Sequence, residues 1–340
     1  MAYFDLPLDA LREYAPSIAI PPDFDAFWRQ TLEETARCAP LSAEFIDLPD
    51  PAYRLVRVQD VSFSGFGGTR VRGWMIVPAD SAFASENTLA GPERLPCLVS
   101  FVGYGGGRSL PIDHLAPAVA GMAHFVMDTR GQGAGWSMGD TPDDVGSGPA
   151  HTGFLTRGVE SPQTYYYRRV FTDAARAVEA AAAHPLVNPA RIAVGGASQG
   201  GGIAIAAAAL APQRVAALLA DVPFLCHVRR AATLTDQPPY SELAAYARAQ
   251  RERTDRAFQT LAYFDCANLV TRVRAPSLWS AALMDLVCPP STVFAAFNRA
   301  PGAKEMCVYE FNGHEGGGAL HAARRLRWLQ QQLGAHLPRA

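Results

Sequence analysis

The most informative stretch of the chain reads RIAVGGASQGGGIAIA and covers residues 191–206. Its first residues are β-branched or small and predict a short buried strand, whereas the residues from Gly200 onward predict a helix of small side chains. The pattern G-x-S-x-G lies between the two, with Ser198 at its centre. A serine on a sharp turn from a strand into a helix is typical of an exposed nucleophile at the edge of a sheet. Ser198 is therefore the candidate nucleophile.

A second match to this pattern, GWSMG at residues 135–139, places Ser137 in a different setting. The residues that follow read DTPDD, and they cannot continue as the first turns of a helix. Ser198 therefore fits the strand–turn–helix setting better, and Ser137 is predicted to be a loop serine.

Short apolar runs alternate with helical patterns on both sides of Ser198, as they do in βαβ units. The expected strands lie at residues 97–102, 123–128, 192–195, 215–221, 276–283 and 306–311, and the expected helices at 171–184, 199–210, 292–300 and 318–333. Residues 54–63 and 70–77 alternate around a glycine-rich turn and predict an antiparallel hairpin at one edge of the sheet. Together with the serine turn, these patterns predict the α/β class and an α/β-hydrolase fold with a doubly wound, mostly parallel sheet.

We expect one α/β-hydrolase domain over residues 1–340, with three additions. Residues 1–50 predict an N-terminal helical extension with an aromatic face, and residues 80–94 predict an exposed loop. Residues 224–262 interrupt the alternation of strands and helices and predict an insertion.

Composition excludes several classes of function. Lys and Arg number 30 against 32 Asp and Glu, so there is no basic excess for binding nucleic acid. No apolar run approaches the roughly 20 residues that a bilayer requires, and the first residues do not resemble a signal peptide. Six scattered cysteines without a CxxC pair indicate reduced thiols. We therefore expect a cytoplasmic protein with no membrane and no nucleic-acid partner.

A serine hydroxyl needs a base to remove its proton, usually an imidazole oriented by a carboxylate. In α/β-hydrolases the acid and the histidine follow the serine in that order, each after a strand. Asp285 follows the strand expected at 276–283, and His314 follows the strand expected at 306–311. Asp221 also ends an expected strand and remains an alternative acid.

The other downstream histidines occupy poorer positions for a base. His227 lies in the insertion, His321 lies within the last helix pattern and His336 lies in the tail. A base must be held rigidly toward the nucleophile, which favours His314.

Acyl transfer also needs two donors aimed at the oxyanion. The backbone N–H of Gln199, directly after the serine, is the expected first donor. The glycine cluster at residues 103–107 follows a strand and allows tight backbone turns, so the N–H of Tyr104 is the expected second donor. A phosphate-binding loop is a weaker interpretation of this cluster, because the GxGxxG spacing and the trailing Lys-Ser/Thr are missing.

These motifs, in this order, resemble those of the acetyl xylan esterase and cephalosporin C deacetylase family, carbohydrate esterase family seven. The resemblance rests on GY at 103–104, RGQ at 130–132, GASQG at 196–200 and HE at 314–315. It extends through FDAFW, VMDTRGQG, YYYRR, DVPF and CPPST, which lie at residues 24–28, 126–133, 165–169, 221–224 and 288–292.

The resemblance implies that Ser198, Asp285 and His314 form a catalytic triad, that Tyr104 and Gln199 supply the oxyanion hole, and that Arg130 and Gln132 brace the site. It implies removal of acetyl groups from xylo-oligosaccharides and cephalosporin C, with no metal and no organic cofactor. It further implies a cytoplasmic homohexamer, a trimer of dimers, with the insertion from Phe224 onward as an interface element.

The sequence departs from the family pattern at two places. The segment at residues 80–94 is longer than usual, which leaves its effect on assembly open, and Ala197 stands where glycine is more common. Alanine is small enough for the turn, so we expect little effect on activity.

The side chains of Phe224, Leu286, Val287 and Tyr104 are expected to line an acyl pocket small enough to favour acetyl groups. A general short-chain carboxylesterase or thioesterase on the same fold remains the alternative, since a triad does not specify the alcohol released. A binding module without catalysis would need a missing triad member. A peptidase is disfavoured because no propeller-like repeat precedes the hydrolase part.

Overall fold

The computed structural model describes residues 3–79, 94–145, 150 and 152–334. The strands of these residues form one sheet in the order β1-β2-β3-β5-β4-β6-β7-β8-β9. β1 to β3 pair antiparallel and β3 pairs antiparallel with β5, whereas the pairs from β5 to β9 are parallel. The strands are β1 (Glu44–Asp47), β2 (Val56–Ser64), β3 (Arg70–Pro78), β4 (Leu95–Phe101), β5 (Ala123–Met127), β6 (Val187–Ala197), β7 (Ala217–Asp221), β8 (Ser277–Ala282) and β9 (Lys304–Tyr309). This mixed sheet confirms the predicted α/β-hydrolase fold.

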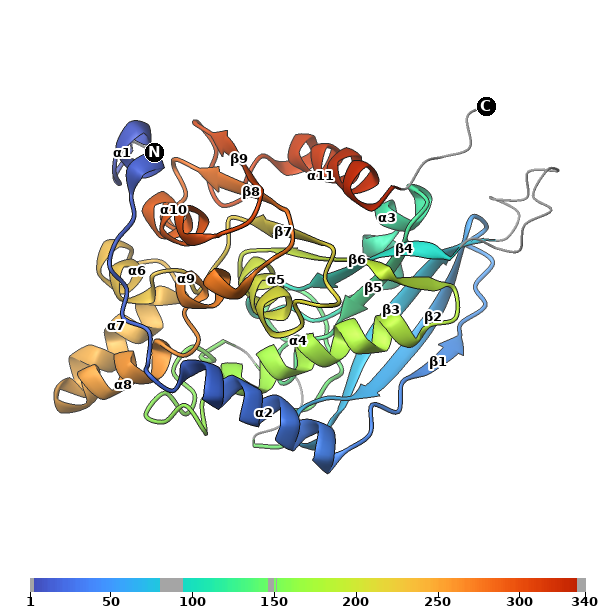
Figure 1. The fold of residues 1–340 in the computed structure, drawn as a ribbon, viewed down its shortest axis with the longest axis horizontal. Helices are drawn as coiled ribbons and strands as arrows, with labels where there is room; N and C mark the ends of the chain where they lie inside the picture. Colours follow the sequence, from blue (N-terminus) through green and yellow to red (C-terminus); the bar gives the residue numbers. More distant parts are fainter. Residues whose placement is uncertain (1–2, 80–93, 146–149, 151, 335–340) are drawn as a thin grey trace.

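Helices cover both faces of the sheet (Figure 1). One face carries α2 (Phe24–Cys38), α4 (Tyr166–Ala183), α5 (Gln199–Leu210), α9 (Cys266–Leu269) and α10 (Pro290–Arg299), whose buried side chains belong to one large core. The other face carries α3 (Ala116–Val119), beside β3 and β5, and α11 (Gly318–Leu333), beside β6 and β7. Each of these two helices covers a smaller core of its own. This doubly wound arrangement brings the carboxyl ends of the parallel strands to one edge, where such folds bind ligands.

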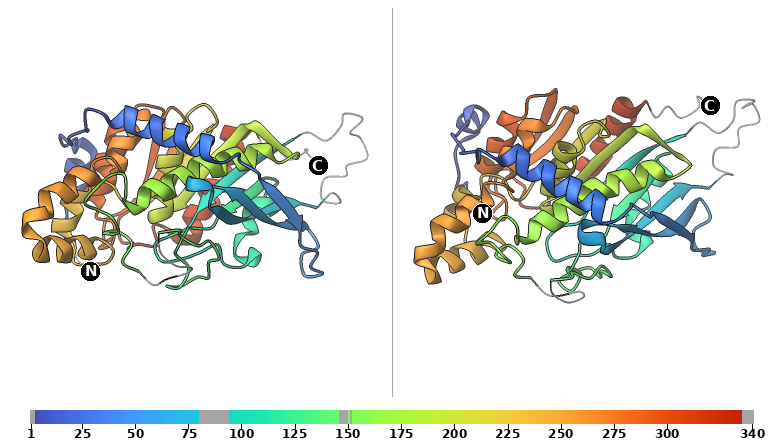
Figure 2. Two further views of the ribbon diagram at one scale, coloured as in Figure 1. Left: turned by 90° about the horizontal axis from the view of Figure 1, so that it is seen from below. Right: turned by 60° about the horizontal axis from the view of Figure 1, so that its bottom comes forward.

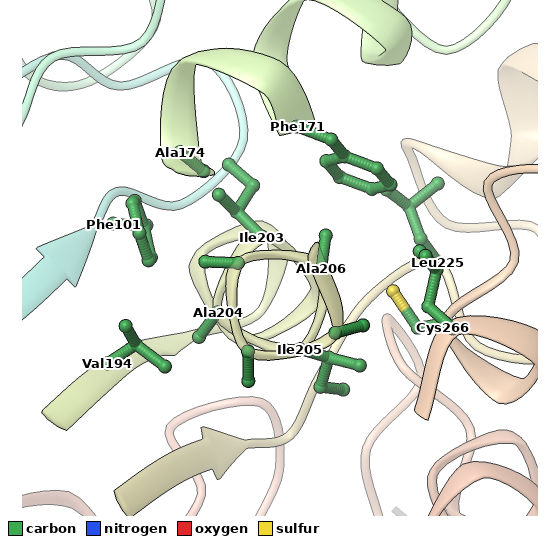
Figure 3. Packing of buried hydrophobic residues seen from close by; sticks show 14 of the residues in the cluster. Phe101, Phe171, Ala174, Val194, Ile203, Ala204, Ile205, Ala206, Leu225 and Cys266 are labelled. Carbon is green, nitrogen blue, oxygen red and sulfur yellow. The ribbon is translucent and has the colours of Figure 1, made fainter. Parts of the chain in front are cut away.

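Helix α5 lies at the centre of the large core (Figure 3). Its side chains from Gln199 to Ala209 are all buried, and Ile203 and Ile205 pack among residues of α4, β6 and α9. Its first turn lies so close to β4 that a Cβ at Gly200 would come 2.1 Å from the carbonyl oxygen of Phe101. Only glycine fits there, and this close approach fixes where the helix begins and therefore where Ser198 lies.

The hairpin predicted at residues 54–63 and 70–77 is present as β2 and β3. The expectation that it forms the sheet edge is wrong, because β1 pairs outside β2. Residues 1–50, where the sequence predicts a helical extension, contain α1 (Leu8–Glu13), α2 and also β1. The four residues of β1 are half-buried or exposed, so no alternating hydrophobic pattern marks them as a strand.

The region after β7 consists of α6 (Val228–Leu234), α7 (Tyr240–Ala249) and α8 (Thr254–Leu261). These helices gather at the end of the molecule opposite β1 (Figure 2). The exposed loop predicted at 80–94 lies outside the described residues apart from Arg94. Among the described helices, none has the length and apolarity needed to cross a membrane.

Candidate active site

Ser198 lies between β6 and α5, with φ 56° and ψ −122°. A positive φ is unfavourable for a residue with a side chain, so the surrounding structure must hold this conformation. The Ser198 N–H donates to the carbonyl of Asp221 and its carbonyl accepts from the Phe224 N–H, both at 2.9 Å. Gly196 allows the turn to close, since a Cβ there would lie 2.5 Å from the carbonyl carbon of Gly200. The predicted strand–turn–helix setting of Ser198 is therefore present.

The turn accommodates Ala197, and Ser137 is a loop serine. The Ala197 residue is exposed, so its methyl group does not crowd the turn. Ser137 lies in an irregular loop after β5, and its hydroxyl donates to the carbonyl of Gly107 at 2.7 Å. Residues 138–145, the described stretch directly after Ser137, contain no helix, and the contact of Ser137 ties two loops together.

Asp285 and His314 form a hydrogen-bonded pair. The Nδ1 of His314 donates to Oδ2 of Asp285 at 2.9 Å, while Oδ1 of the same carboxylate accepts from the backbone N–H groups of Val287 and Cys288 at 2.8 and 2.9 Å. Asp285 is fully buried, whereas 32% of the His314 side chain is exposed. This arrangement fixes the ring and leaves Nε2 available as a base.

Ser198 and His314 line the same cavity, which has a volume of about 710 Å³. Burial and the Asp285 carboxylate raise the pKa of the Cys288 thiol while the Ser198 hydroxyl lowers it, which places the serine beside the loop between β8 and α10. Within the described chain, no hydrogen bond joins Ser198 Oγ to the imidazole. Catalytic hydrogen bonds commonly tighten only when substrate is present.

Asp221, the alternative acid, has different partners. It accepts from Nε2 of His321 at 2.8 Å and pairs with the guanidinium of Arg325 at 2.9 Å. Both partners belong to α11, so Asp221 fastens that helix to the sheet. His227 lies at the start of α6, and His336 lies outside the described residues.

Gln132 connects the two predicted oxyanion donors. Its Oε1 accepts from the Gly105 N–H at 2.7 Å, and its Nε2 donates to Oε1 of Gln199 at 2.8 Å. The Gln199 amide in turn donates to the carbonyl of Val102 at 3.1 Å. The loop that carries the Tyr104 N–H is therefore held to the first residue of α5.

Arg130 lies behind this network and is not among the residues that line the cavity. Its guanidinium forms two hydrogen bonds to the carboxylate of Asp173 on α4. Burial alone would lower the pKa of Arg130, but Asp173 and Asp143 outweigh that effect and raise it. Arg130 therefore holds the loop after β5 against α4 and acts on the site from a distance.

The side chain of Tyr104 is held by a residue that sequence reasoning missed. Its hydroxyl donates to the carboxylate of Glu242 at 2.8 Å and accepts from the backbone N–H of Phe154 at 2.6 Å. Burial raises the pKa of Glu242, against the opposing effect of the hydrogen bonds that its carboxylate accepts from the Tyr104 hydroxyl and the Leu155 N–H. Glu242 lies on α7, and no motif in the sequence marks it as part of the site.

The residues predicted to form an acyl pocket separate into two groups. Val287 lines the cavity together with Tyr104. Phe224 is buried and packs its ring against Tyr240, with 4.5 Å between ring centroids, and neither it nor Leu286 is among the cavity-lining residues. In residues 3–79, 94–145, 150 and 152–334, no three His, Cys, Asp or Glu side chains form a cluster that could hold a metal ion.

The sequence model of the acetyl xylan esterase family matches residues 1–332. The chain belongs to this family. The family comprises carboxylic ester hydrolases, and the chain is a serine esterase of this type.

Several relatives agree with this assignment. The acetyl esterase Axe7A of Xylanibacter ruminicola is 24% identical over 322 residues, covering 92% of this chain and 67% of its own. The acetyl xylan esterase of Paenibacillus sp. R4 has a TM-score of 0.86 and 35% identity, covering 96% of this chain and 99% of its own. The acetyl xylan esterase 1 of Thermoanaerobacterium sp. JW/SL YS485 has a TM-score of 0.83 and 32% identity, covering 97% and 99%. A puromycin hydrolase with a TM-score of 0.60 and 21% identity shares the fold.

Proposed function

We propose that this esterase removes acetyl groups from small acetylated carbohydrates, with Ser198, His314 and Asp285 as its catalytic triad. The observation that carries the proposal is the buried Asp285 carboxylate bound to His314, whose ring shares one cavity with the conformationally strained Ser198. The proposed braces of the site are Arg130 and Gln132.

The proposed reaction has two steps. His314 Nε2 accepts the proton of Ser198 as its oxygen attacks the acetyl carbonyl, and Asp285 stabilises the resulting imidazolium. The N–H groups of Tyr104 and Gln199 stabilise the oxyanion, and His314 returns the proton to the departing alcohol. Water, deprotonated by the same imidazole, then releases acetate and regenerates Ser198.

Acetylated xylo-oligosaccharides and cephalosporin C are the proposed substrates. The printed names of the similar proteins are those of acetyl esterases and acetyl xylan esterases. A cavity of about 710 Å³ has room for a sugar ring in addition to an acetyl group. No observation favours the alternative function, that of a general carboxylesterase or thioesterase.

We further propose a cytoplasmic homohexamer, a trimer of dimers, in which the insertion at residues 224–262 is an interface element on a single hydrolase domain. Support comes from the family membership, from free cysteines of the kind found in reducing compartments, and from the projection of α6 to α8 at one end of the molecule. The native mass in solution tests the assembly.

The central test is the variant Ser198→Ala. We expect loss of acetate release from acetylated xylo-oligosaccharides and cephalosporin C by a factor of about 10³ or more, with folding unchanged. A p-nitrophenyl ester series measured in parallel reports the acyl preference, which should favour acetyl over butyryl and decanoyl. Burst kinetics retained by the variant would contradict the assignment of Ser198, and a preference for long acyl chains would support a general esterase.

A further inference from the structure

Trp136 is the feature of the site that the proposed reaction does not use. It lines the same cavity as Ser198 and His314, yet 67% of the residue is exposed. Aromatic side chains bury large apolar areas when they are covered, so an exposed indole in a ligand cavity is available for contact with a ligand.

The indole is held in one orientation. Its Nε1–H donates to the carbonyl of Tyr104 at 2.8 Å. One part of the ring rests on a glycine backbone, since a Cβ at Gly106 would lie 2.5 Å from the ring and a Cβ at Gly103 would lie 3.4 Å from it. Because Gly103 and Gly106 have no side chains, the indole lies directly against the loop. The rest of the ring faces the cavity and solvent.

We propose that Trp136 is a stacking platform for the sugar ring that carries the acetyl group, a proposal that rests on the proposed function. The C–H groups on one face of a pyranose form an apolar surface that can cover an aromatic ring. Because the hydrogen bond and the glycine contacts already fix the indole, little side-chain entropy is lost when a sugar binds. Trp136 thereby favours esters of ring alcohols over esters of small flexible alcohols.

A second role of the same side chain must be separated from stacking. The peptide between Tyr104 and Gly105 is held at both ends, with its carbonyl bound to Trp136 and its N–H bound to Gln132. Loss of the indole N–H could therefore disturb the oxyanion donor and slow every ester equally. Trp136→Phe removes this hydrogen bond and keeps an aromatic face, whereas Trp136→Ala removes both.

The experiment compares the kcat/KM of both variants and wild type on acetylated methyl xyloside and on ethyl acetate. Stacking predicts that Trp136→Ala loses about 10-fold or more on the xyloside, mainly through KM, relative to its change on ethyl acetate. Trp136→Phe should keep most of the preference for the xyloside. Met138→Ala, an exposed neighbour outside the cavity lining, is the matched control and should change neither substrate.

Two results would overturn the stacking role. Equal losses on both substrates in both variants would show that Trp136 acts only through Tyr104, and an unchanged ratio in Trp136→Ala would show that it contacts no sugar. A wild-type enzyme that hydrolyses ethyl acetate and leaves the xyloside intact would instead overturn the proposed carbohydrate substrate.

Discussion

Asp221 ends β7 and Asp285 follows the neighbouring strand β8, yet their carboxylates have different partners. Strand position in the sequence favoured Asp285 and kept Asp221 as the alternative acid. In the structure the carboxylate of Asp285 binds His314 beside the cavity, whereas that of Asp221 binds His321 and Arg325 on α11. The sequence could not exclude Asp221, because which helix or loop lies beside each strand end is decided by tertiary packing.

Because the two carboxylates have different partners, replacing each aspartate by asparagine should affect different properties, catalysis in one case and stability in the other. Asp285→Asn should lower kcat by about 10⁴-fold, because the amide no longer fixes the imidazole tautomer. Asp221→Asn should leave kcat within a few-fold and lower the free energy of unfolding by about 3 kcal/mol, because it leaves Arg325 without its carboxylate. Steady-state kinetics and thermal unfolding of both variants check this, and a loss of kcat in Asp221→Asn without a loss of stability would contradict it.

At the scale of elements, local patterns predicted α5 and α11 with the ends that the structure shows, at Gln199–Leu210 and Gly318–Leu333. Glycines and a run of small apolar residues mark α5 in the sequence itself, and an apolar periodicity that begins at a glycine marks α11. β1 was missed because its four residues become a strand only by pairing with β2. The link between α7 and the site was missed for a similar reason, since the pairing of Glu242 with Tyr104 spans 138 residues.

The link through Glu242 makes α7 a positioning element for the oxyanion loop. Glu242→Ala removes the acceptor of the Tyr104 hydroxyl, and we expect kcat to fall by about 10-fold or more with a smaller change in KM. Glu242→Gln should recover part of the loss, because its amide oxygen still accepts that hydrogen bond. Both are measured on the acetylated xyloside.

Glu252, in the exposed turn Arg251–Arg253, supplies the matched control. Glu252→Ala should leave both kcat and KM unchanged. A lower melting temperature in Glu242→Ala with kcat unchanged would show that the contact serves folding alone.

At the scale of the whole molecule, the site draws on loops after β4, β5, β6, β8 and β9 and on α7. Motifs within single loops carried the resemblance, and these could be found in the sequence. The polar contacts between loops, such as that of Gln132 with Gln199, could not be found there, because they depend on how the elements pack. Sequence therefore indicated which groups are the candidates for catalysis, and the fold shows how they are held.

Global stability should fall in acid because of a buried histidine on β5 that is not part of the proposed catalytic pair. His124 on β5 is 4% exposed; its Nδ1 donates to the carbonyl of His114 at 2.7 Å, and its Nε2 accepts from the Ser100 hydroxyl at 2.8 Å. Burial lowers the pKa of His124 from 6.5 to about 3. The folded state therefore keeps the ring neutral, while the unfolded chain takes up a proton below pH 6.5.

Because the unfolded chain takes up the proton and the folded protein does not, the free energy of unfolding falls as the pH falls. The stabilisation by neutral His124 is present above pH 6.5 and is lost progressively as the pH falls toward 3. Between pH 6.5 and 5 this loss should lower the free energy of unfolding by about 2 kcal/mol, which denaturant titrations at fixed protein concentration can measure. His124→Gln cannot titrate, so it should start less stable at pH 7.5 and lose less than wild type on acidification. Parallel pH dependences of the two proteins would mean that other groups govern the acid sensitivity, because the only titrating group that the substitution removes is the imidazole.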